Sequence, residues 1–142
     1  MKILSYDYES QNGSNMAQKD LQQIIADTRV RYDSIGRVWC PVLNSYVHFT
    51  SEGRLHLIYK GNRKKRTVKE QIYKLNLFPL VIPVLKTSSE IESWRFRGES
   101  KNIQYYAISG EVGRKKSRIR VIIKRTGDGQ FNYYSVMLED NK

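Results

Sequence analysis

The 142-residue sequence has one cysteine, two histidines, three prolines and no uninterrupted apolar run long enough to span a membrane. Cys40 forms no disulfide within the chain, and with two histidines it is too little for a Cys/His zinc cluster. The longest apolar stretch, 75–85, is interrupted by Asn76, Pro79 and Pro83. The amino terminus lacks the apolar core of a secretory signal. We therefore expect a cytoplasmic protein with no membrane partner, no cofactor and no metal.

Acidic residues are also few, with 14 Asp and Glu against 25 Lys and Arg, which gives a formal net charge of +11. The excess lies in two windows. Residues 54–74 carry eight basic side chains and one acidic one, residues 113–125 carry seven and none, and the remainder is slightly acidic. Such patterning is typical of a surface that binds a polyanion, although solvated charge runs are an ordinary alternative. Neither window has the apolar helical face that would favour a membrane over RNA.

We expect a single domain over 1–142, because the chain is too short for two full ones. It divides into a flexible start (1–14), a mainly helical part (15–90) and an antiparallel sheet (91–142). Spacing and cap residues predict these elements before the sheet: a helix over 15–32, a hairpin or two extended pieces over 38–50, a short helix from Ser51 carrying residues 55–59, a helix opened by a Thr67–Glu70 capping box, and a further helix over 79–85.

Four strand-like runs follow, at 94–97, 103–112, 118–126 and 131–138, with turn sequences between them. They predict an antiparallel meander. The fold class is therefore α+β, with N-terminal helices packed on one face of a C-terminal four-stranded antiparallel sheet.

The free face of this sheet is predicted from the alternation of side chains along each strand. Burying Ile119, Val121 and Ile123 against the helices turns their neighbours outward. Trp94, Phe96 and Tyr134 are likewise expected to be buried. The free face would then display a set of basic, aromatic and hydroxyl side chains: Arg95, Arg97, Arg118, Arg120, Lys124, Tyr105, Tyr133, Ser109 and Ser135. Guanidinium groups that bind phosphate, next to rings that stack on bases, favour single-stranded RNA, although a plain solvated face is the alternative.

His56 is the better of the two histidines as a proton-transfer group. Lys60 lies four residues further along the predicted helix and Arg54 is close by, so we expect these cations to lower the pKa of His56 and keep the ring neutral. Metal-free RNA cleavage needs a base for the 2′-hydroxyl, cations for the phosphate and an acid for the 5′-oxygen. A structural or surface histidine is the alternative interpretation.

The segment HFTSEGRLHLIYK, followed by the strands WRFRG, YYAISGEV, RIRVIIKRTGDG and FNYYSVM, resembles the barnase, EndoU, colicin and RelE-like ribonuclease superfamily, particularly its phage- and mobile-element-borne branches. The resemblance covers roughly 47–138. It implies that His56 is the general base or acid, that Arg95 and Arg120 bind the scissile phosphate, and that Ser135 completes the site. A carboxylate like the catalytic Glu of barnase is missing, so the resemblance is to the His/Arg/Lys type.

These observations predict a toxin-like, metal-independent endoribonuclease that leaves a 2′,3′-cyclic phosphate. Lys60, Arg97, Arg118, Lys124, Tyr105 and Tyr133 would bind the RNA. Two alternatives use the same basic surface. One is a non-catalytic nucleic-acid-binding module, and the other is a protein-interaction domain that docks an acidic partner such as an immunity or antitoxin protein.

Overall fold

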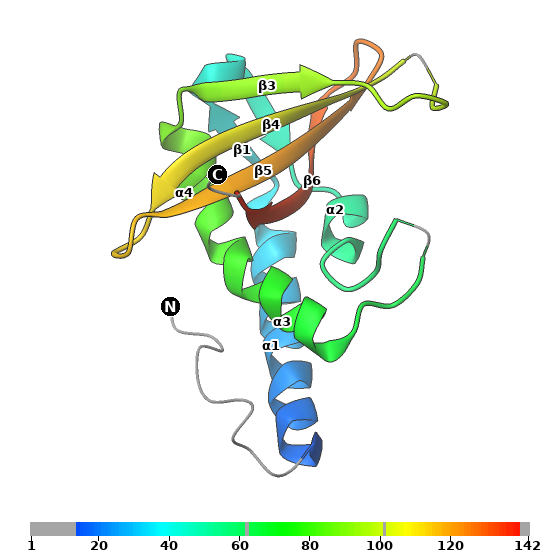
Figure 1. Cartoon of the computed structure of the whole chain (residues 1–142), viewed down its shortest axis with the longest axis vertical. Helices are drawn as coiled ribbons and strands as arrows, with labels where there is room; N and C mark the ends of the chain where they lie inside the picture. The colour runs from blue at the N-terminus through cyan, green and yellow to red at the C-terminus, as the bar shows by residue number, and fades with distance from the viewer. Residues whose placement is uncertain (1–13, 62, 101, 140–142) are drawn as a thin grey trace.

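The computed structural model describes residues 14–61, 63–100 and 102–139, so most of the flexible start predicted over 1–14 lies outside the described residues. The described part is an α+β fold, shown in Figure 1. Its helices are α1 (Ser14–Ile35), α2 (Ser51–Leu55), α3 (Val68–Leu77) and α4 (Val81–Thr87), with 3-10 turns η2 (Pro41–Leu43) and η3 (Phe78–Leu80). Its strands are β1 (Arg37–Cys40), β2 (Ser45–His48), β3 (Glu90–Trp94), β4 (Ile103–Val112), β5 (Ser117–Thr126) and β6 (Phe131–Leu138).

Local signals place the helix ends. Gly36, directly after α1, has a φ of 70°, the left-handed conformation that ends many helices and that glycine adopts most easily. The predicted capping box at the start of α3 is confirmed, since Thr67 Oγ1 accepts a hydrogen bond from the Glu70 backbone N–H and Glu70 Oε1 accepts one from the Thr67 N–H. Among the described helices, none is long and apolar enough to cross a membrane.

The sheet has six strands in the order β1-β2-β6-β5-β4-β3, so the prediction of a four-stranded antiparallel sheet is wrong in number and in direction. The predicted hairpin over 38–50 forms β1 and β2, and β2 then pairs with β6 in parallel through Val47 with Phe131 and His48 with Asn132. This pairing joins segments far apart in the sequence, and no alternation pattern reveals which strands meet. The result is a curled, mixed sheet.

The helices cover one face of this sheet, as predicted. Val81, Val84 and Leu85 of α4 are buried with Ile108 and Val121 in the main hydrophobic core. In Figure 1, α1, α3 and α4 lie on one side of the sheet and α2 lies beside β6. A smaller apolar cluster on the other side is formed by these residues: Tyr105, Ala107 and Ile122, with Trp94 and Tyr134 packed against them. We call the side with this cluster the open face.

A β-bulge in β6 changes the predicted side of two tyrosines. Ile122 pairs with Ser135 and Ile123 with Tyr133, so Tyr134 is the extra residue between them. Tyr133 is therefore turned into the main core, where it is 1% exposed. Tyr134 joins the open-face cluster instead. The prediction of an exposed Tyr133 and a buried Tyr134 is wrong because strict alternation breaks at the bulge.

The strand predicted over 94–97 is wrong in position and in orientation, because β3 ends at Trp94. Trp94 pairs with Tyr105 and stacks on its ring at 5.9 Å, which places Trp94 on the open face. Arg95 follows the strand and its Nε donates a hydrogen bond to Gln104, the neighbour of Tyr105 on the opposite side. Arg97 is exposed in the loop after β3. Neither arginine belongs to the free basic face that alternation predicted.

Candidate functional site

A hollow of about 640 Å³ lies where the end of α2 and the loop after it meet β6. We call it the His56 pocket. It combines an imidazole, a carboxylate, two tyrosines and basic side chains, and its lining residues are Ser51, Glu52, Leu55, His56, Tyr59, Lys60, Gly61, Arg63 and Tyr134. Because its lining includes His56, the histidine singled out in the sequence, the pocket is the candidate site.

Close packing of α2 on β6 positions His56. Gly53 of α2 is buried, and a Cβ there would lie 2.5 Å from the Tyr133 backbone oxygen, so only glycine fits this contact. His56 caps the end of α2, and its ring packs on Tyr134 with a centroid distance of 4.3 Å. The predicted helix through 55–59 is wrong beyond Leu55. Lys60 therefore does not lie on a helix with His56.

Arg66 holds the imidazole from the other side. Its Nε donates to the His56 backbone oxygen at 3.0 Å, and its Nη2 lies 3.3 Å from His56 Nδ1. A guanidinium only donates, so Nδ1 accepts and the neutral ring carries its proton on Nε2. Burial, followed by the positive charges of Arg66, Lys74 and Lys124, lowers the pKa of His56 to about 4, while Glu52 opposes the shift.

The predicted direction of this pKa change agrees with the structure, but the predicted causes do not. Arg54 Nη1 is 3.2 Å from an Asp33 carboxylate oxygen, and Lys60 Nζ is 3.3 Å from Glu70. Each of these cations has an acidic partner outside the pocket lining. The lowered pKa of His56 comes instead from burial and from cations on α3, β5 and the loop before α3.

Lys74 is a buried cation that sequence reasoning missed. Its Nζ donates to Ser135 Oγ at 3.0 Å and to the Val136 backbone oxygen at 2.6 Å. Burial, and then Arg66, lowers the pKa of Lys74 to about 8. The available signal was its position on the apolar stripe of α3, three residues after the buried Gln71 and next to Leu75. Ser135 is 5% exposed, so the predicted site serine is an acceptor inside the protein.

Glu52 supplies a carboxylate at the mouth of the pocket. Lys124 Nζ is 2.8 Å from Glu52 Oε2, and the same ammonium lies 5.4 Å from the centre of the Tyr134 ring. Sequence reasoning treated Glu52 only as part of a helix start. Glu52 and Lys124 are far apart in the sequence, so no local sequence pattern predicts that they pair.

The open face carries Arg118 and Arg120 as predicted, but carboxylates neutralise them. Arg118 Nη2 is 2.7 Å from Glu90 and 2.7 Å from Glu139, and Arg120 Nη2 is 2.5 Å from Glu92. These pairs turn the expected basic face into a mixed one. Arg120 lines a separate hollow of about 150 Å³ with residues of β3 and β4, and this hollow does not include His56.

The sequence-predicted site residues are therefore not gathered at one place. His56 and Lys60 line the pocket, and Lys124 borders it through Glu52. Tyr105 lies on the open face as predicted but is 2% exposed, because aromatic rings cover it and its hydroxyl donates to Glu99. The other members lie elsewhere: Arg95 beside Gln104, Arg97 in a loop, Arg118 and Arg120 in ion pairs, and Tyr133 and Ser135 buried.

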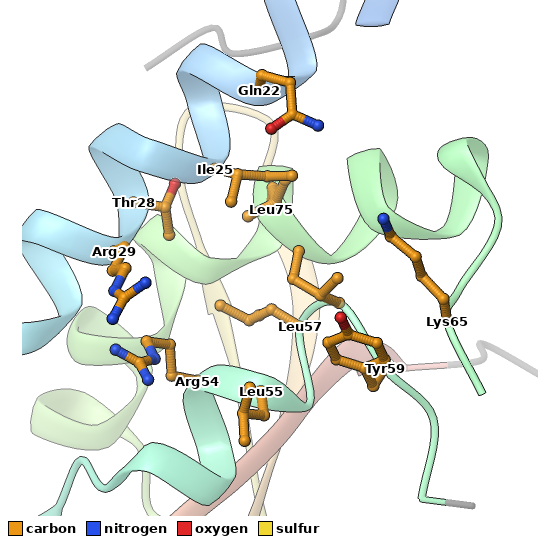
Figure 2. Close-up of a pocket in the computed structure, with 11 residues that line it drawn as sticks. Gln22, Ile25, Thr28, Arg29, Arg54, Leu55, Leu57, Tyr59, Lys65 and Leu75 are labelled. Carbon is orange, nitrogen blue, oxygen red and sulfur yellow. The ribbon is translucent and has the colours of Figure 1, made fainter. Parts of the chain in front are cut away.

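A second hollow, of about 290 Å³, lies between α1, α3 and the segment after α2 (Figure 2). Ile25, Leu57 and Leu75 give it an apolar floor, and Arg29 and Arg54 lie at its rim. Its lining has no histidine or carboxylate. Across the described residues, no three His, Cys, Asp or Glu side chains are grouped as a metal site would require. Among the described residues, the His56 pocket is the one of these hollows whose lining contains an imidazole.

Comparison of the chain with protein-family models, with curated proteins and with solved structures found no match. Function is therefore inferred from the geometry of the described residues.

Proposed function

We propose that this protein is a metal-independent endoribonuclease whose active site is the His56 pocket. The observation that carries the proposal is the combination of a neutral imidazole, an aromatic ring and several cations around one open hollow. Cations attract and stabilise a phosphate whose negative charge grows during the reaction, and a neutral imidazole accepts a proton. The net charge of +11 favours a polyanionic substrate over a neutral one.

RNA binding would also tune the base. A phosphate in the pocket competes with His56 for the Arg66 guanidinium, which binds phosphate oxygens better than a neutral nitrogen. Release of Arg66 frees Nδ1 of His56. The negative charge of the phosphate beside the ring would raise the pKa of His56 from about 4 toward the physiological range, where a general base is most effective.

The reaction then follows a simple course. Nδ1 of His56 takes the proton of the 2′-hydroxyl, and the 2′-oxygen attacks phosphorus. The bond between phosphorus and the 5′-oxygen breaks, and the leaving 5′-oxygen takes a proton from a water molecule in the open pocket. The imidazolium of His56 gives its proton to the hydroxide that remains, which restores water and the neutral base. Arg66 and Lys124 stabilise the phosphorane. The products are a 2′,3′-cyclic phosphate and a 5′-hydroxyl, with no oxidant or metal consumed.

A DNA strand that contains one ribonucleotide tests this proposal. Cleavage should occur only after the ribonucleotide, in EDTA, and should leave a cyclic phosphate that mass spectrometry identifies. An all-DNA strand is the matched control and should remain intact. Cleavage of both strands, or of neither under conditions where RNA binds, contradicts the assignment.

The contact between Arg66 and Nδ1 also favours a second candidate, a module that binds nucleic acid without cleaving it. If Arg66 stays on Nδ1 when phosphate binds, His56 has no free base nitrogen and the pocket serves only as an anion site. This candidate predicts salt-dependent RNA binding with no cleavage of the mixed strand. The same experiment therefore separates the two.

A further inference from the structure

The hairpin of β1 and β2 presents two exposed aromatic rings and one arginine on the same face. Val38 and Cys40 are buried, so their neighbours Arg37 and Trp39 point to the opposite side. Trp39 pairs with Tyr46 across the hairpin, and the two residues are 45% and 40% exposed. Large neighbouring rings left in solvent are unusual on a small protein and often mark a binding surface.

The three side chains are held by one another. The Arg37 guanidinium carbon lies 3.9 Å from the centre of the Tyr46 ring, and the rings of Trp39 and Tyr46 meet edge to face at 5.0 Å. Tyr46 is thus fixed between a cation and an indole. A guanidinium on a ring keeps its N–H groups for phosphate, and a half-exposed indole can stack on a base.

Arg37 differs from the cations of the open face in its partners. Arg118, Arg120 and Lys124 each pair with a carboxylate. Within the described residues, Arg37 has no carboxylate partner, and its contact is the Tyr46 ring. Its positive charge is therefore available to a phosphate without breaking an ion pair.

The strand pairings connect this hairpin with the His56 pocket. Arg37 pairs with His48, His48 with Asn132, and Asn132 with Lys124, so all four lie in one row on the open face. With about 4.8 Å between strands and about 3.4 Å per residue, Tyr46 lies about 12 Å from Lys124 along the sheet. Lys124 in turn bonds to Glu52 of the pocket. A short single strand can reach both places.

We propose that Arg37, Trp39 and Tyr46 form a base-stacking subsite for unpaired nucleotides of the RNA strand held at the His56 pocket. This inference rests on the proposed function. Trp39 stacks on a base, Tyr46 supports Trp39 and Arg37, and Arg37 binds the adjoining phosphate. The subsite selects single strands because bases in a duplex do not expose their faces to an indole on a sheet. The basic net charge, and an Arg37 with no carboxylate partner among the described residues, favour nucleic acid over a protein as the occupant.

Fluorescence of Trp39 tests the subsite directly. In a Trp94→Phe background Trp39 is the single tryptophan, since the chain contains two. We would titrate this variant with a short 2′-O-methyl RNA strand, which has no 2′-hydroxyl to react, and follow tryptophan emission together with the anisotropy of a dye on the strand. Stacking should quench the emission in parallel with the rise in anisotropy.

Two substitutions and a matched control complete the experiment. The Trp39→Ala variant should bind the strand about 5- to 150-fold more weakly than the wild type, because one base loses its stacking partner. Arg37→Ala should also weaken binding and lower the salt dependence by about one phosphate contact. Arg31→Ala removes the same charge from an exposed position on α1, outside the hairpin, and should bind like the wild type.

The outcomes separate this inference from the proposed function. Binding and cleavage of RNA without quenching, and with Trp39→Ala equal to the wild type, would overturn the subsite and leave the His56 pocket intact. Failure of the wild type to bind any RNA would overturn the proposed function itself, and the subsite with it. A dimer that Trp39→Ala dissociates in sedimentation would assign the surface to self-association and also overturn the subsite.

Discussion

Arg66 Nη2 lies 3.3 Å from Nδ1 of His56, the nitrogen that carries no proton in the neutral ring. The basicity of His56 is therefore coupled to the position of a guanidinium that a phosphate can attract. In the free protein burial and this contact keep the pKa of His56 at about 4. The central prediction of the proposed mechanism is that bound substrate moves Arg66 away from Nδ1 and raises the pKa of His56.

The pH dependence of cleavage should show this coupling. The acid limb of kcat/KM reports the free protein and should lie near the His56 pKa of about 4. The acid limb of kcat reports the RNA complex and should lie at higher pH, because the phosphate favours the imidazolium. Steady-state cleavage measured across pH gives both limbs. A single limb shared by the two parameters would contradict the release of Arg66.

Gly53→Ala should displace α2 and lower both stability and cleavage. The new Cβ would lie 2.5 Å from the Tyr133 backbone oxygen and 2.6 Å from the Tyr32 hydroxyl, so backbone must move. Overpacking of this kind costs about 1–3 kcal/mol. Gly110→Ala is the matched control, since its Cβ would meet only ordinary contacts at 3.6 Å and beyond. Urea unfolding should separate the two variants, and equal midpoints would show that the α2 contact is not tight.

Lys74→Met should destabilise the protein more than Ser135→Ala. Methionine leaves the buried Ser135 hydroxyl and the Val136 carbonyl without a donor, a loss of about 1–3 kcal/mol. Ser135→Ala removes one acceptor, while Lys74 keeps the carbonyl, so about 1 kcal/mol is expected. Cleavage by Ser135→Ala should stay close to the wild type. A large loss of cleavage with unchanged stability would instead indicate that Ser135 takes part in catalysis.

The lowered pKa of Lys74 adds a second readout for the Met variant. The folded pKa is about 8 and the ordinary value is 10.5, so the unfolded chain binds more protons between these values. Lys74 should therefore increase the free energy of unfolding as the pH rises from about 8 to 10.5. The difference between the wild type and Lys74→Met should show this slope, and its absence would mean that Lys74 is solvated.

Glu92→Gln should tighten RNA binding at low salt. The substitution removes the carboxylate 2.5 Å from Arg120 and leaves the guanidinium with only a longer contact, 3.5 Å, to Glu139, so that Nη2 becomes available to a phosphate. Glu111→Gln, which removes an exposed carboxylate from the same sheet, is the matched control for net charge. Anisotropy titrations should show a larger gain for Glu92→Gln. Equal gains would indicate that only net charge matters and that Arg120 does not contact the strand.

The helices could be predicted from the sequence because their signals are local. The Thr67–Glu70 capping box and the glycine at position 36 fix helix ends by contacts within a few residues. The strands β4 and β6 were predicted with the bounds that the structure has. The curled six-stranded sheet could not be predicted, because the parallel pairing of β2 with β6 is a long-range choice.

The candidate site could be predicted only in part. Alternation placed Arg118, Arg120 and Lys124 on the correct face, but it could not show that Glu90, Glu92 and Glu139 neutralise the arginines. The β-bulge at Tyr134 interrupts the alternation of side chains along β6, and no turn residue in the sequence indicates where it lies. His56 was preferred over the other histidine because Arg54 and Lys60 were expected to lie beside it, but both cations pair with carboxylates outside the pocket lining. Its partners Arg66 and Lys74 come from other elements and appear only in the folded chain.

Incubation of RNA with the purified protein in EDTA tests the central claim most directly. The wild type and His48→Ala should both degrade the RNA and leave 2′,3′-cyclic phosphate ends, while His56→Ala, folded as shown by circular dichroism, should leave it intact. Because His48 is the other histidine of the chain, this pair of variants separates the His56 pocket from a contaminating nuclease. RNA that stays intact with the wild type, or is degraded equally by His56→Ala, would contradict the account.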